Sequence, residues 1–128
     1  MSQALTKSKS SPKKEQAFLD LIIDSIQDIK GKNILLLDLR KLPDAPTSYF
    51  IICEGESSTQ IKAIAGNVER RVKAEAGYLA HSEGQIGAKW VLVDFFDVVV
   101  HIFDKDTRRY YELEDLWSDA RITEYQNL

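Results

Sequence analysis

The chain has 128 residues and a formal net charge of −3, from 20 acidic and 17 basic side chains. This length fits one domain with a hydrophobic core and is too short for two. The apolar runs are far shorter than a membrane span and no signal pattern opens the sequence, so we expect a cytoplasmic protein without membrane contact. Acidic residues outnumber basic ones after residue 91, which argues against binding nucleic acid phosphates and favours a basic protein partner.

The ends of the chain are predicted to be tails. Residues 1–12 are rich in Ser and Lys and contain no acid, so we expect a disordered basic tail that contacts RNA at most weakly. A single α/β domain is predicted for residues 13–122, and a short tail for residues 123–128.

The first half of the domain shows one helix and two strands. Ser11 and Pro12 provide a cap and a first-turn proline, and apolar residues then follow at helical spacing, which predicts a helix over residues 12–29. Residues 33–39 and 49–53 are short apolar runs typical of strands that are buried on both faces.

A second helix follows the capping-box spacing of Ser57 and Gln60 and is predicted to end near Gly77. Residues 78–83 could form a third strand, and residues 108–111 are predicted to be extended. A last helical turn is expected around Leu113, Leu116 and Trp117.

This order predicts a mixed sheet of about five strands with the long helices mainly on one face. The other face then needs cover. A homodimer, another protein partner or the terminal helix could supply it.

Residues 90–103 read as two apolar strands joined by a turn at Phe95 and Phe96. The pairs that this turn predicts lie on one face: Asp94 with Asp97, Leu92 with Val99, and Trp90 with His101. Facing carboxylates and an exposed Phe pair are unfavourable in isolation, which indicates a partner that supplies cations and apolar cover. In the alternative, one Phe folds into the core and the two Asp side chains only solvate the hairpin end.

Residues that could carry chemistry are few. Cys53 lies in an apolar run and is expected to be a buried, inert thiol. His81 and His101 share no metal-ligand spacing with Cys53, so structural roles are expected for both, and we expect no metal site and no cofactor.

Two other functions remain open at this point. The first is a metal-dependent nucleotidyltransferase-like enzyme in which Asp94 and Asp97 hold a divalent ion beside a phosphate at Ser57 and Ser58. The second is a dimeric scaffold whose apolar hairpin pairs only with itself. An interface agrees better with the pattern: a cationic side chain of a partner would lie between the two Asp residues, and Trp90 and Phe95 would be the apolar anchors that are typical of a binding hot spot.

Four segments together resemble the ribosomal silencing factor family, also called RsfS or Iojap-like. They are TSYFIICEGESSTQ (47–60), EG (83–84), AKWVLVDFFDVVVHIF (88–103) and RRYYELEDLW (108–117), in family order and spacing. The resemblance implies a nucleotidyltransferase-like α/β fold without the catalytic carboxylates of that superfamily, and therefore a binding protein rather than an enzyme.

The resemblance further implies docking on ribosomal protein L-fourteen of the large subunit. This docking would block joining of the small subunit and lower translation when nutrients are scarce. By position, it assigns Trp90, Asp94, Phe95 and Asp97 to the partner-binding face, and Leu92 is predicted to join them because it shares the strand face of Trp90 and Asp94.

The chain departs from the family pattern at three positions. Phe96 stands where glycine is usual, Ser48 replaces an acid, and Glu54 replaces a small hydroxyl residue. A turn that needs positive φ disfavours Phe, so the turn could be of another type.

Overall fold

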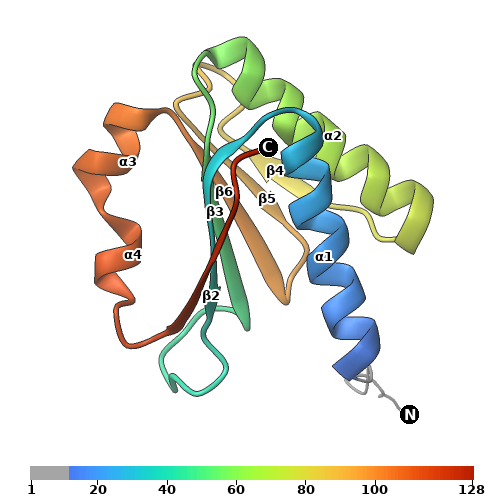
Figure 1. Ribbon diagram of the computed structural model, residues 1–128, viewed down its shortest axis with the longest axis vertical. Helices are drawn as coiled ribbons and strands as arrows, with labels where there is room; N and C mark the ends of the chain where they lie inside the picture. Colours follow the sequence, from blue (N-terminus) through green and yellow to red (C-terminus); the bar gives the residue numbers. More distant parts are fainter. Residues whose placement is uncertain (1–11) are drawn as a thin grey trace.

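The computed structural model describes residues 12–128. They form a six-stranded sheet in the order β4-β5-β6-β3-β2-β7, with helices on both faces (Figure 1). The strands are β2 (Lys32–Asp38), β3 (Tyr49–Glu54), β4 (His81–Glu83), β5 (Trp90–Asp94), β6 (Val98–Phe103) and β7 (Arg121–Tyr125). Only β3 and β6 pair in parallel and the other neighbours are antiparallel, which confirms the predicted mixed sheet.

The two long helices, α1 (Pro12–Asp28) and α2 (Ser58–Ala76), lie side by side on one face, as predicted. The side chain of Ser57 accepts a hydrogen bond from the Gln60 amide, and Gly77 ends α2 in the left-handed conformation at φ 77°. The Gln60 side chain also donates to the Ile29 carbonyl at 2.9 Å, which ties the start of α2 to the end of α1.

The main core lies between these helices and the sheet. Its helix residues include Ile22, Ile26, Ile64 and Val68, all buried. Alternate residues of the sheet, among them Ile51, Cys53, Val91, Val93, Val100 and Ile102, meet them. This alternation is the expected result of burying one sheet face under amphipathic helices.

The opposite face is partly covered by α3 (Lys105–Tyr111) and α4 (Leu113–Leu116). Leu113 and Trp117 pack against a second cluster that includes Phe50, Ile52 and Phe103. The prediction of a last helical turn here is confirmed, and the terminal helix supplies part of the cover that the sequence required.

The prediction that residues 108–111 are extended is wrong, because they belong to α3. The Asp104 side chain accepts a hydrogen bond from the Thr107 amide at 2.7 Å and caps this helix. Arg108 then reaches the strands and donates to Glu54 at 2.9 Å and to the Asn33 carbonyl at 2.7 Å. Capping and a buried ion pair thus stabilise a helix that has only seven residues.

The sixth strand explains the difference from the expected five. β7 pairs antiparallel with β2 at one edge of the sheet, so the sheet includes part of the segment predicted to be a C-terminal tail. β4 forms the other edge and is shorter than the predicted strand at residues 78–83, because only three residues pair with β5. The predicted basic tail falls almost wholly in residues 1–11, outside the described part of the chain. None of the helices within residues 12–128 has the length and apolar content to cross a bilayer.

Candidate partner-binding site at the β5–β6 hairpin

The hairpin formed by β5 and β6 pairs in a different register from the predicted one. Asp94 lies opposite Val99, Leu92 opposite His101, and Trp90 opposite Phe103. The predicted pairing of Asp94 with Asp97 is therefore wrong, because the turn is centred one residue later in the chain. Asp97 belongs to the turn and does not face Asp94 across the ladder.

The turn is a tight one around Phe96. The Asp97 amide donates to the Phe95 carbonyl at 3.0 Å, which closes a three-residue γ-turn with Phe96 at φ 75°. A left-handed backbone costs a non-glycine residue about 1–2 kcal/mol. Two side chains offset this strain: Asp94 Oδ1 accepts from the Phe96 amide at 2.7 Å, and Thr47 Oγ1 donates to the Phe96 carbonyl at 2.6 Å.

The register places Trp90, Leu92 and Asp94 of β5 on the sheet face opposite α1 and α2, together with Val99 of β6. We call these four residues the hairpin face. All four are half-buried, so neither the protein core nor α3 and α4 covers them completely. His81 and Glu83 of β4 are exposed and lie opposite Asp94 and Leu92, on the same face.

Trp90 is a structural anchor as well as a candidate contact residue. Its indole ring stacks on Phe103 with centroids 4.8 Å apart and lies 4.8 Å from the ring of Tyr111. Its N–H donates to Nδ1 of His101 at 3.1 Å. A Trp90→Ala change therefore removes packing beneath α3, and loss of binding in that variant would not report docking alone.

His101 is held neutral inside the sheet. It is 5% exposed and packs between Phe50 and Trp90. Burial lowers the pKa of its imidazole to about 4. The role expected from the sequence, a structural histidine, agrees with this position.

This histidine is expected to make the protein sensitive to mild acid. Because the folded pKa lies below the ordinary value of 6.5, the unfolded chain gains a proton between pH 6.5 and 4 that the folded chain does not. As the pH falls through this window, the imidazole should therefore lower the free energy of unfolding, by about 3 kcal/mol in total once the pH reaches the folded pKa. Above pH 6.5 it should contribute no pH dependence. Urea unfolding at pH values from 8 to 5, followed by tryptophan fluorescence, measures the effect.

The matched variant is His101→Gln, which can still accept the indole hydrogen bond but does not titrate. All other ionisable groups are common to the two proteins, so only His101 should make the two stability curves diverge below pH 6.5. Parallel curves over this range would mean that the imidazole is not held neutral by the fold.

Phe95 does not lie on the hairpin face. It is half-buried on the helix side of the sheet and meets the ring of Phe18 edge-on at 5.6 Å. The alternative that one Phe of the pair folds back toward the core is thus the observed one. Phe96, by contrast, is 86% exposed.

The residues of the nucleotidyltransferase alternative do not come together. Asp97 precedes β6 and Ser57 follows β3, and because these strands are parallel the two residues lie at opposite ends of the sheet. Within residues 12–128, no three His, Cys, Asp or Glu side chains gather in an arrangement that could hold a metal ion. Cys53 is fully buried, and burial raises the pKa of its thiol to about 12, as expected for an inert cysteine.

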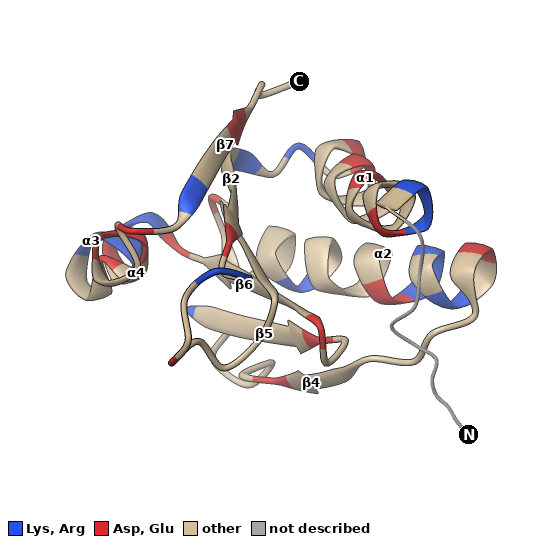
Figure 2. Cartoon of the chain, turned by 90° about the horizontal axis from the view of Figure 1, so that it is seen from below, with Lys and Arg blue, Asp and Glu red and all other residues tan. Residues whose placement is uncertain are grey.

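The turn of the hairpin carries two carboxylates. Figure 2 shows acidic segments on both sides of the β5–β6 turn, where Asp94 and Asp97 lie. Neither carboxylate takes part in an ion pair within the described residues. Half-buried apolar side chains beside uncompensated negative charge suit a basic protein surface better than a nucleic acid.

Comparisons with known proteins identify the family of the chain. The model of a family described as "Ribosomal silencing factor during starvation" matches residues 11–128. The ribosomal silencing factor RsfS of Chromobacterium violaceum is 42% identical over 109 residues, which cover 83% of this chain and 86% of that protein. The RsfS of Halalkalibacterium halodurans is 35% identical over 113 residues, covering 88% of this chain and 96% of that protein.

Solved structures show the same fold. A crystal structure of a Chromobacterium violaceum protein superimposes with a TM-score of 0.76 at 42% identity and covers 80% of this chain and 85% of its own. A Bacillus halodurans crystal structure gives a TM-score of 0.72 at 37% identity, covering 86% of this chain and 99% of its own. The chain therefore belongs to the ribosomal silencing factor family, and its role is the ribosome-associated silencing of translation.

Proposed function

We propose that this protein docks on ribosomal protein L-fourteen of the large subunit and thereby prevents the small subunit from joining. It acts by steric exclusion, without catalysis. The hairpin face and the acidic turn after it form the docking site, with Trp90, Leu92, Asp94 and Asp97 as contact residues. Phe95 supports the hairpin from the other side of the sheet.

One observation carries the proposal. The hairpin face leaves Leu92 and Val99 half-exposed in the middle of a sheet, directly beside carboxylates that have no ion-pair partner within residues 12–128. Apolar side chains at the centre with charged groups around them are the usual composition of a protein interface. A basic ribosomal protein would supply both the apolar cover and the cations.

Co-sedimentation with isolated large and small subunits tests the proposal, together with a sucrose-gradient assay of subunit joining. We expect the wild type to bind only the large subunit and to reduce joining. In Leu92→Lys, a cation replaces the apolar centre of the hairpin face, and we expect binding to fall by about tenfold or more.

The matched control is Thr123→Lys on β7, which adds the same charge at an exposed position on an edge strand that is not part of the hairpin. This variant should bind like the wild type. A wild type that binds neither subunit would contradict the proposed function. If Leu92→Lys binds the large subunit as tightly as Thr123→Lys and the wild type do, the docking site lies elsewhere on the molecule.

A further inference from the structure

Phe96 is an aromatic residue at a turn position where its ring does not help to stabilise the fold. The ring is 86% exposed and the backbone is left-handed at φ 75°, a conformation that glycine adopts without strain. Exposure means that the ring contributes little to the core. Backbone strain that persists at an exposed position often reflects a function of the side chain.

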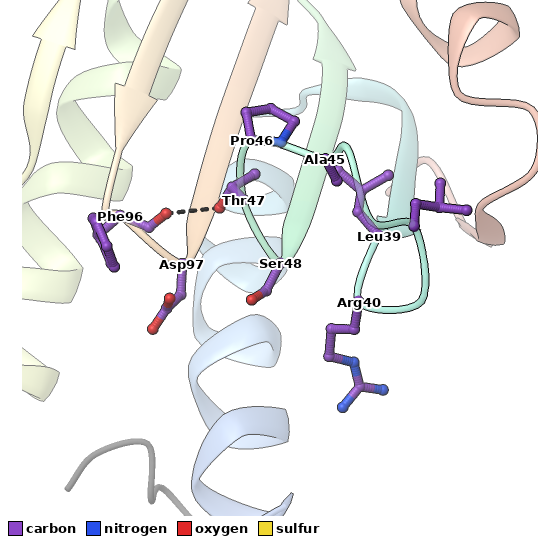
Figure 3. Close-up of a pocket in the computed structure, with 9 residues that line it drawn as sticks. Leu39, Arg40, Ala45, Pro46, Thr47, Ser48, Phe96 and Asp97 are labelled. Carbon is purple, nitrogen blue, oxygen red and sulfur yellow. Dashed lines mark hydrogen bonds between the residues drawn. The ribbon is translucent and has the colours of Figure 1, made fainter. Parts of the chain in front are cut away.

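The hydrogen bonds at the turn hold the backbone, not the ring. Asp94 accepts from the Phe96 amide, and Thr47 donates to the Phe96 carbonyl. The Tyr49 amide also donates to the Asp97 carbonyl at 3.0 Å, which joins the turn to β3. These contacts do not need a phenyl group, yet they fix the direction in which it projects. In Figure 3 the Phe96 ring and the Asp97 carboxylate both point away from Pro46.

The turn borders a shallow pocket of about 260 Å³ that Phe96 and Asp97 help to line, together with Arg40, Thr47 and Ser48. The only cation in this lining is Arg40, and it is already paired with Asp38 at 2.8 Å and with Glu15 at 3.2 Å. Asp97 is exposed, and its carboxylate has no hydrogen bond or ion pair with the rest of residues 12–128. The free charge at the mouth of the pocket is therefore negative.

We infer that Phe96 and Asp97 together form a receptor for a lysine or arginine side chain of the partner protein. The ring offers its face to the cation while the neighbouring carboxylate accepts a charge-assisted hydrogen bond. A phosphate group would be repelled by Asp97, so the chemistry favours a basic protein over RNA at this position. The inference rests on the proposed function and adds a contact beyond the hairpin face.

Two variants of Phe96 separate the ring from the backbone strain. Phe96→Gly removes both, so we expect a melting temperature equal to or above that of the wild type and binding to the large subunit about tenfold weaker. Phe96→Leu keeps an apolar side chain at the strained position but has no aromatic face, and we expect weakening of about threefold or more. Titrated co-sedimentation gives the affinities and thermal unfolding gives the melting temperatures.

The control is Leu128→Ser, which removes another exposed apolar side chain, 60% exposed, at the end of the chain. That end lies beside the last turn of α1, because Gln27 donates to the carbonyl of Gln126, whereas the hairpin turn packs near Phe18 in the first half of α1. We expect no change in binding. If the wild type binds the large subunit and both Phe96 variants bind it with the same affinity as the wild type, the inference is overturned and the proposed function stands.

Asp97→Asn distinguishes the two classes of partner. Loss of the carboxylate should weaken binding to the large subunit if the turn receives a cationic side chain. The opposite result has two parts: Asp97→Asn binds more tightly than the wild type, and protein-free large-subunit RNA is captured by the wild type but not by Phe96→Gly. Together they would indicate that the ring stacks on an RNA base, and they would overturn the inference of a receptor for a cationic side chain. A wild type that does not bind the large subunit at all would contradict the proposed function itself.

Discussion

Replacing Asp97 by lysine is expected to weaken binding to the large subunit by about 100-fold or more, because juxtaposed like charges in an interface cost several kcal/mol. Asp97 lies in the turn of the hairpin, and only its backbone hydrogen-bonds within residues 12–128. The fold should therefore tolerate the change. Affinity from titrated co-sedimentation, at two salt concentrations, measures the loss and its electrostatic part.

Glu124→Lys makes the same change in net charge on β7, at an exposed position at the edge of the sheet. It controls for long-range attraction between the whole protein and the ribosome, which salt screens beyond about 8–10 Å. Equal losses of affinity in the two variants would mean that net charge, and not a contact at the turn, governs binding. Asp94 is a less clean target than Asp97, because Asp94→Lys would also remove the acceptor for the Phe96 amide.

The helices and central strands could be predicted from sequence because each has a strong local signal. The spacing of apolar residues defines α1, and the Ser57 cap with Gly77 defines both ends of α2. The short elements lack such signals. α3 depends on Asp104 as a cap and on the ion pair between Arg108 and Glu54 of β3. These two residues are 54 positions apart, so local sequence cannot predict their contact.

The hairpin that carries the candidate site was predicted from the sequence, but in the wrong register. The prediction placed the turn at Phe95 and Phe96 because these residues lie between two apolar runs, and the pairing of Asp94 with Asp97 followed from that placement. The chain instead turns around Phe96, since Thr47 from a distant loop and Asp94 supply hydrogen bonds that hold a phenylalanine at positive φ. In the observed register, Phe95 lies on the helix side of the sheet and not on the hairpin face, and Phe96 is the exposed aromatic residue of the turn.

The largest effect on stability is expected for Arg108→Met. Arg108 is 7% exposed and donates to Glu54 at 2.9 Å and to Glu114 at 3.1 Å. Methionine fills a similar volume but leaves the Glu54 carboxylate half-buried without its cation. Breaking a buried ion pair from one side typically costs about 3–5 kcal/mol, and we expect a loss near the lower value because Glu54 keeps some contact with solvent. Urea unfolding at pH 7 measures the loss.

Arg109→Met is the matched control, since Arg109 is the next residue of the same helix and is exposed. Its stability should stay within about 0.5 kcal/mol of the wild type. The double variant Arg108→Met with Glu54→Gln should recover part of the loss, because the amide carries no buried charge. A double variant no more stable than Arg108→Met would show that the unpaired charge of Glu54 is not the cause of the loss. The ion pair also affects the proposed docking site, because α3 lies against Trp90 of the hairpin face. If α3 detached from the sheet, it would expose further apolar surface beside the hairpin face.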